Sequence, residues 1–285
     1  MWPPSGFTLS AEIHVPELPE VETTRRGIEP HVIGAKIREI ILKRRDLRQP
    51  IPPSLESLEG QKIRSVSRRS KYLLFGIADG STMLIHLGMS GSLRVIDPGS
   101  AWKTHDHVGI TLSNGKQLRF HDPRRFGLVL HFEGEPSSHP LLSHLGPEPL
   151  EEAFTPAVLK AACATRKAAI KLVIMDAKVV VGVGNIYASE ALFRAGILPK
   201  TPANKLTLPR LKKLTEAIKA VLADSIEQGG TTLRDFLHSD GEPGYFRQRL
   251  FVYERKGEPC LVCGTTIRHE TLGQRSTYWC PKCQR

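Results

Sequence analysis

The chain has 285 residues, and its 40 Lys and Arg against 29 Asp and Glu give a formal net charge of +11 with histidine neutral. With 40% hydrophobic residues it is not a disordered chain, and no apolar run reaches the roughly 20 residues of a membrane helix. The first fourteen residues carry no Lys or Arg and no apolar core, so they lack the pattern of a signal peptide. The composition predicts a cytoplasmic globular protein whose partner is a polyanion, with nucleic acid the first candidate.

The first half of the chain combines one helix with many short strands. A helical pattern starts at Pro16 and is expected to end near Gly27. Short apolar segments follow, separated by turn signals such as Asp79-Gly80. These segments are 36–42, 71–77, 82–87, 107–112, 116–121 and 127–132. Many short strands at close spacing predict a β-sandwich or barrel rather than a parallel sheet.

The second half of the chain has a different pattern. Residues 155–228 favour helices, and the clearest helix is expected to stop at Gly229-Gly230. Its apolar face consists of Leu211, Leu214, Ile218, Val221 and Leu222. The last segment, 249–285, is short, basic and rich in cysteine. Strands first, helices next and a cysteine-bearing tail predict an α+β chain of several domains.

The cysteine spacing of the tail is the most specific pattern that spacing alone provides. Two Cys-x2-Cys pairs, Cys260 with Cys263 and Cys280 with Cys283, are separated by sixteen residues. This spacing is typical of a four-thiolate zinc hairpin, in which one structural zinc replaces the core that so short a segment cannot build. Two disulfides or four free thiols are the alternatives. Cys163 stands alone in a helical segment and is expected to be buried.

A glycine-rich turn, VGVGNIY at 181–187, lies between two helical patterns. Such a turn exposes the first backbone N–H groups of the next helix, where the helix dipole and the Asn185 amide would favour a phosphate. An ordinary turn between two helices is the alternative, because so short a motif is not specific.

Five motifs give the sequence a family resemblance. They are PELPE at 16–20, KYL at 71–73, HLGMSGSLR at 86–94, DPRRFG at 122–127 and QR at 274–275. Together with the cysteine pairs and the glycine-rich turn, they closely resemble the bacterial formamidopyrimidine-DNA glycosylases, bifunctional repair enzymes for oxidised purines. The resemblance extends from Pro16 to the C-terminus.

The resemblance implies an α+β multidomain fold with three parts: an N-terminal β-sandwich with flanking helices, a helix–two-turn–helix DNA-binding domain and a C-terminal zinc-finger β-hairpin. In this sequence they correspond to 16–148, 149–238 and 249–285, with a lesion-recognition loop and linker at 239–248 and an extension at 1–15. The implied partner is double-stranded DNA with oxidised bases or abasic sites, bound in a cleft between the first two parts. The resemblance further implies a monomer on the bacterial nucleoid, without a membrane partner.

The resemblance also assigns catalytic residues. Pro16 corresponds to an N-terminal proline whose secondary amine attacks the anomeric carbon of the sugar and forms an iminium. Glu17 corresponds to the general acid/base for sugar-ring opening, and Glu20 to a supporting carboxylate. Lys71 and Arg275 correspond to residues that contact phosphate and assist elimination. Without the other motifs, Pro16 and Glu17 would be an ordinary helix start and Lys71 a solvated charge.

One departure from the family pattern concerns the N-terminus. Fifteen residues precede Pro16, and the motif is VPELPE where the family has MPELPE. The nitrogen of an internal proline is a tertiary amide without a nucleophilic lone pair, so the chain as written could not form the iminium. We therefore expect residues 1–15 to be absent from the active protein, with the codon of Val15 acting as initiator.

Further positions correspond to the family's DNA contacts. Met89, Arg124 and Phe126 match three residues that enter the duplex and fill the space of the flipped nucleotide. The DNA-contacting positions are His105, Arg124, Arg166 and Asn185. The lesion loop that closes over the oxidised purine is Ser239, Asp240, Gly241, Glu242, Pro243, Gly244 and Tyr245. A core position is the alternative for Met89 and Phe126, and a surface salt bridge for Arg124.

Two other functions fit parts of the sequence. The endonuclease VIII type of the same superfamily prefers oxidised pyrimidines, but it typically begins PEGPE, so Leu18 and the segment 239–245 favour purines. A non-catalytic damage-binding protein would have the same fold, zinc and basic surface if the extension is real and Pro16 is blocked. We expect the glycosylase, which would remove 8-oxoguanine and formamidopyrimidines and nick the strand by β- and δ-elimination.

Overall fold

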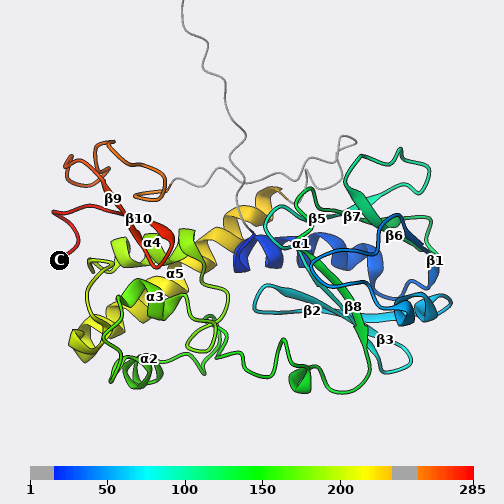
Figure 1. Cartoon of the computed structure of the whole chain (residues 1–285), viewed down its shortest axis with the longest axis horizontal. Coiled ribbons are helices and arrows are strands. Elements are labelled where there is room, and N and C mark those ends of the chain that lie inside the picture. Colours follow the sequence, from blue (N-terminus) through cyan, green and yellow to red (C-terminus); the bar gives the residue numbers. More distant parts are fainter. Residues whose placement is uncertain (1–15, 233–249) are drawn as a thin grey trace, which may run out of the picture.

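The computed structural model describes residues 16–232 and 250–285, which form a β-sandwich, a group of helices and a C-terminal hairpin (Figure 1). The α+β multidomain fold expected from the sequence is confirmed. The sandwich part contains α1 (Leu18–Val32), β1 (Ile37–Leu42), η1 (Pro53–Leu58), β2 (Ile63–Arg69), β3 (Tyr72–Ile77), β4 (Thr82–His86), β5 (Ser92–Ile96), β6 (Asp106–Leu112), β7 (Gln117–His121) and β8 (Leu128–Phe132). The segment after β8 contains η2 (Pro136–Ser138), and the helical part contains α2 (Pro156–Cys163), α3 (Ile170–Ile174), α4 (Asn185–Arg194), η3 (Ala203–Lys205) and α5 (Leu208–Thr232). The hairpin consists of β9 (Arg268–Leu272) and β10 (Arg275–Trp279).

The sandwich consists of two four-stranded antiparallel sheets, β1-β6-β7-β5 and β2-β3-β4-β8. Their inward side chains form one apolar core, to which α1 contributes Val21, Ile28 and Val32. All six strands expected from the apolar segments are present, so the prediction of a sandwich is confirmed. Burial of this shared core is the main force that holds the two sheets together.

The sequence pattern does not predict β2 and β5. Within β2, only Ile63 and Val66 are buried, and the pairing register shifts between Ile63 and Ser65. That irregularity removes the alternation of apolar and polar residues by which a strand is recognised. β5 directly follows a glycine-containing loop, and it buries the charged side chain of Arg94.

Two helices continue through the glycines that were expected to end them. α1 passes Gly27, and α5 passes Gly229-Gly230. A Cβ atom at Gly229 would lie 2.5 Å from Thr23 Oγ1 of α1, so glycine at this position allows the two helices to pack closely. The predicted helix ends are wrong, because tertiary packing outweighs the roughly 1 kcal/mol by which glycine weakens a helix.

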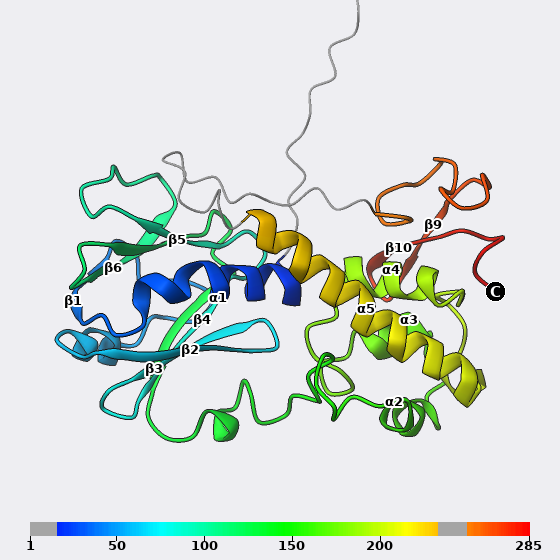
Figure 2. The ribbon, with the colours of Figure 1, turned by 180° about the vertical axis from the view of Figure 1, so that it is seen from behind.

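Packing between the parts places α1 at their junction. α2, α3, α4 and α5 share a second apolar core, and α1 contacts α5 as well as the sandwich (Figure 2). The β9–β10 hairpin packs against α4. Among the helices in the described part of the chain, none has both the length and the apolar character needed to cross a membrane.

Candidate active site and zinc centre

The buried carboxylate of Glu17 lies at the N-terminus of α4, where sandwich and helices meet. Glu17 is 2% exposed. Its Oε2 accepts hydrogen bonds from the backbone N–H groups of Gly184 at 2.8 Å and Tyr187 at 3.4 Å, and its Oε1 accepts one from Ile186 at 3.0 Å. The sequence predicted a phosphate at the N-terminus of this helix. In the structure, three of the backbone N–H groups there donate to the carboxylate of Glu17 instead. The interpretation of these N–H groups as a phosphate site is therefore wrong.

Gly184 is required by this contact. A Cβ atom at Gly184 would lie 2.1 Å from the Glu17 Cδ atom. The Leu18 N–H also donates to Gly182 O at 3.2 Å, so the start of α1 lies along the glycine-rich turn. This turn therefore holds the buried Pro16 and Glu17 against the helical part.

A buried hydrogen-bond chain continues from Glu17 through Glu20. Glu20 Oε2 accepts from the Glu17 N–H at 2.9 Å, and the Tyr187 hydroxyl donates to Glu20 Oε1. The Tyr187 hydroxyl also bonds Ser225 Oγ of α5 at 2.7 Å. Burial raises the pKa of Glu20, and the nearby Glu17 charge raises it further. The chain connects α1, α4 and α5 behind the first residues of the sandwich part.

Lys171 is a buried lysine that the sequence analysis did not single out. It is 0% exposed, and its Nζ donates to Ser276 O at 2.7 Å and Thr277 Oγ1 at 2.9 Å. Burial lowers the pKa of Lys171 to about 7, Glu17 opposes that shift, and Arg275 adds to it. The signal in the sequence was one charged residue within the apolar segment 168–175.

Arg275, expected on the zinc hairpin, is exposed at the first position of β10. The turn before it contacts α3, since a Cβ atom at Gly273 would lie 2.9 Å from a Leu172 methyl group. The charges of Glu17 and Arg275 act in opposite directions on the pKa of Lys171, so both groups lie within electrostatic range of this lysine.

Lys71 is half-buried in the turn between β2 and β3. Burial together with the charges of Lys71 and Arg48 lowers the pKa of His86 to about 4. His86 Nδ1 accepts a hydrogen bond from the Gly88 N–H at 3.0 Å, so the proton of the neutral ring is on Nε2. Arg48 and His86, for which no role was expected, lie near Lys71 and form a second group of cationic and polar side chains with it.

Met89, Arg124 and Phe126, which we call the wedge residues, come from two loops of the sandwich. Phe126 is 45% exposed, so it is not a core residue, and Met89 is half-buried. The Arg124 guanidinium lies 5.8 Å from the Phe126 ring centroid. Within residues 16–232 and 250–285, Arg124 forms no salt bridge. His105 is exposed in the loop before β6.

The remaining expected DNA contacts lie in the helical part. Arg166 pairs with Asp176 at 3.0 Å. Asn185 begins α4, and its Oδ1 atom is buried without a hydrogen-bond partner among the described residues. The expected lesion loop, 239–245, lies outside the described residues.

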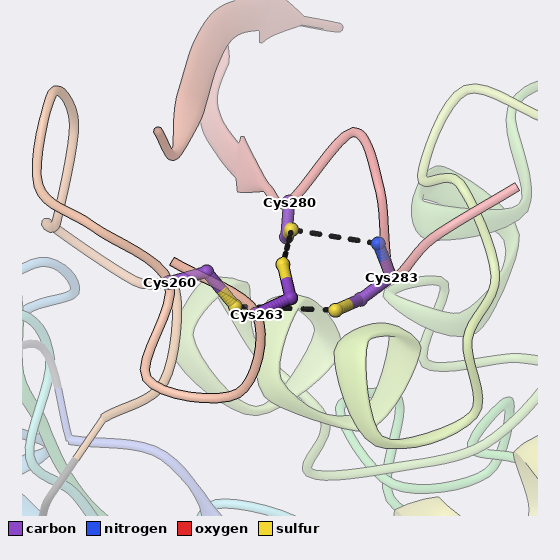
Figure 3. A group of neighbouring side chains, drawn as sticks. All are labelled: Cys260, Cys263, Cys280 and Cys283. Atoms are coloured by element: carbon purple, nitrogen blue, oxygen red, sulfur yellow. Dashed lines mark hydrogen bonds between the residues drawn. The ribbon is translucent and has the colours of Figure 1, made fainter. Parts of the chain in front are cut away.

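The four cysteines of the tail form a zinc site (Figure 3). Their Sγ atoms all lie within 4.8 Å of one another, with 4.0 Å between Cys260 and Cys283 and 3.4 Å between Cys263 and Cys280. Zinc–sulfur bonds of about 2.3 Å in a tetrahedron require sulfurs about 3.8 Å apart, so the set fits one ion. None of the five cysteines is in a disulfide, which excludes the disulfide alternative, and Cys163 is buried as expected. Four protein ligands leave no position for water, so the zinc is structural.

Comparison with known proteins agrees with this architecture. Residues 15–129 match the model of the formamidopyrimidine-DNA glycosylase N-terminal domain, 145–237 match the formamidopyrimidine-DNA glycosylase H2TH domain, and 257–285 match the zinc finger found in FPG and IleRS. The formamidopyrimidine-DNA glycosylases of Methylococcus capsulatus and Xanthomonas axonopodis pv. citri are 56% and 54% identical over 272 residues, which cover 95% of this chain and 100% of each relative. The chain belongs to the formamidopyrimidine-DNA glycosylase family.

Solved structures show the same fold. The MutM (Fpg) protein of Thermus thermophilus has a TM-score of 0.82 at 40% identity, covering 94% of this chain and 98% of that one. The Lactococcus lactis Fpg in complex with DNA containing an abasic site has a TM-score of 0.85 at 32% identity, covering 95% and 100%. The expectation of this family from five sequence motifs is confirmed.

Proposed function

We propose that the protein is a base-excision-repair glycosylase with AP-lyase activity, which removes 8-oxoguanine and formamidopyrimidines from double-stranded DNA in the cytoplasm. The observation that supports this best is the position of Glu17, buried beside Pro16 and held by three backbone N–H groups of another part of the molecule. A carboxylate fixed so tightly next to a candidate amine nucleophile suits acid–base chemistry on a bound sugar.

In the proposed reaction, the Pro16 amine forms a bond to the anomeric carbon and the bond from that carbon to the base breaks. The base leaves with the electron pair of the broken bond and takes up the proton that the Pro16 nitrogen loses, while Glu17 delivers a second proton to the ring oxygen as the sugar opens to an iminium. The iminium accepts electrons during loss of a C2′ proton, which expels the 3′ phosphate, and a second elimination expels the 5′ phosphate. Lys71 and Arg275 would stabilise the phosphates that leave.

This chemistry requires a free amine at Pro16. We propose that the active chain begins at Pro16, because an amide nitrogen has no lone pair to attack with. The wedge residues would fill the space of the extruded nucleotide, and His105, Arg166 and Asn185 would contact phosphates, which makes affinity fall with salt.

Borohydride trapping tests the proposal. Two chains, one beginning at Pro16 and one at Met1, are verified by intact mass and incubated with an 8-oxoguanine duplex and borohydride. The Pro16 chain should excise the base and become covalently attached to DNA, whereas the Met1 chain should do neither. If an intact Met1 chain is trapped equally well, the nucleophile is not the Pro16 amine and Lys71 is the first lysine to test. Preferential excision of oxidised pyrimidines would instead favour the endonuclease VIII type.

A further inference from the structure

Two loops of the sandwich touch each other backbone to backbone. The β4–β5 loop, 87–91, and the β7–β8 loop, 122–127, each cross from one sheet to the other. Gly88 has φ of +69°, and a Cβ atom there would lie 2.5 Å from the Phe126 carbonyl carbon and from Gly127 N. No side chain fits between the loops at this point, so the position of one loop fixes the position of the other.

The side chain of Asp122 joins these two loops. It is 0% exposed. Its Oδ1 accepts a hydrogen bond from Ser90 Oγ at 2.9 Å, and its Oδ2 accepts one from the Gly127 N–H at 2.8 Å. Ser90 Oγ in turn accepts from the Arg124 N–H at 3.2 Å. We call the pair Asp122 and Ser90 the clasp.

The backbone of Asp122 connects a third loop. Its N–H donates to His105 O at 2.9 Å, and its carbonyl accepts from His107 Nε2 at 2.8 Å. All four polar atoms of Asp122 therefore have partners, and these partners lie in or beside the loops that carry Met89, His105, Arg124 and Phe126.

We infer that the clasp is a positioning device for the wedge residues. Ser90 directly follows Met89, and its hydroxyl accepts a hydrogen bond from the Arg124 N–H. Asp122 precedes Arg124 and Phe126 in the chain, and its carboxylate bonds both Ser90 and the Gly127 N–H that follows Phe126. Arg124 and Phe126 are exposed, so hydrogen bonds to the backbone behind them, rather than burial, hold their loop in place. This inference rests on the proposed function, in which these residues enter the duplex.

The test compares Ser90→Ala with Ser81→Ala, a matched control. Ser81 is buried and its Oγ donates to Asp79 Oδ1 at 2.7 Å, but it lies in the β3–β4 turn, which carries no wedge residue. The probes are a duplex with a tetrahydrofuran abasic analogue, an undamaged duplex, and 2-aminopurine opposite the analogue to report insertion. Ser90→Ala should lose about tenfold in affinity for the damaged duplex only, with a smaller 2-aminopurine change. Ser90→Thr, which retains a hydroxyl, should recover both, and Ser81→Ala should match the parent chain.

Thermal melting of each variant checks that it is folded before its binding is compared. Equal losses on damaged and undamaged DNA, or no difference between Ser90→Ala and Ser81→Ala, overturn the clasp. Arg124→Ala measured in parallel separates the two ideas. If Arg124→Ala leaves damage-specific binding intact, the wedge assignment of the proposed function fails; if it lowers that binding while Ser90→Ala does not, only the clasp fails.

Discussion

Candidate functional residues are buried at the junction formed by α1 but exposed in the two loops that carry the wedge residues, 87–91 and 122–127. At the junction, Glu17 and Lys171 are buried, and each has hydrogen-bond partners from another part of the molecule. In the two loops that carry the wedge residues, 87–91 and 122–127, Arg124 and Phe126 are exposed, and the side chain of Asp122 behind them is buried. Burial with several hydrogen bonds fixes the geometry of a group that acts on a bound sugar, whereas a group that must contact DNA stays exposed and is held by the residues behind it.

The largest effect is expected from a change to the buried carboxylate of Glu17 at the junction. Glu17→Gln keeps the shape of the side chain but removes its proton chemistry, so single-turnover excision of 8-oxoguanine should fall by about 10³-fold or more. Affinity for the damaged duplex should stay within about threefold, because Glu17 faces backbone N–H groups rather than solvent. Glu29→Gln, at a partly exposed position of the same helix, is the control and should have parent activity. Normal excision by Glu17→Gln would remove Glu17 from the reaction.

Loss of the metal is the next largest effect, and it acts on the hairpin rather than on the junction. Cys283→Ser should lose the one tightly bound zinc, because three thiolates and a hydroxyl bind it much more weakly. The hairpin should then lose its structure, and DNA affinity should fall by about tenfold or more. Elemental analysis and binding anisotropy measure both. Cys163→Ser, outside the site, should retain zinc; full DNA affinity in a zinc-free protein would contradict the role of the metal.

The comparison also shows what the sequence could reveal. The zinc site followed from spacing alone, since four thiols in two knuckles have few other uses. The family followed from motifs, as did the wedge residues, and the structure finds Phe126 exposed rather than in the core. The predicted helix ends are wrong, because the close approach of Gly229 to Thr23 depends on residues that are far apart in the chain.

The junction was harder to predict because its groups act through tertiary contacts. A turn such as VGVGN predicts an anion at the helix start, yet only the fold shows that the anion is Glu17. Lys171 looks like one charge in an apolar run, and its role depends on Ser276 and Thr277, which follow it by about a hundred positions in the chain. A sequence shows which residue types are present for a reaction. The hydrogen-bond partners and burial that shift the pKa values of such residues are determined by tertiary packing.

A moderate effect should distinguish the exposed arginines. Arg124→Ala should weaken binding of a damaged duplex by about tenfold and change undamaged binding little, because in the proposed function the guanidinium fills the space of the extruded nucleotide. Arg166→Ala should weaken both by a similar factor of a few-fold and lower the salt dependence of affinity, since a phosphate contact carries no damage information. Arg166 must exchange its partner Asp176 for DNA, which limits the loss. The opposite pattern for the two variants would reverse their assignments.

The smallest expected effect is a pH dependence of stability at the junction. The pKa of Lys171 is lowered to about 7, mainly by burial, from an ordinary value near 10.5. Below pH 7 both the folded and the unfolded chain bind the proton, and the cost of burying the charge is fully present. Between about pH 7 and 10.5 the unfolded chain still binds the proton that the folded protein has released, so this lysine makes folding stability rise with pH. The free energy of unfolding of the parent chain minus that of Lys171→Met should therefore increase by about 2 kcal/mol from pH 6 to pH 9.

Urea unfolding at both pH values measures this difference, with Lys212→Met on the exposed face of α5 as a control that shows no such increase. A difference that stays flat for Lys171→Met would mean that the lysine keeps its proton in the folded protein.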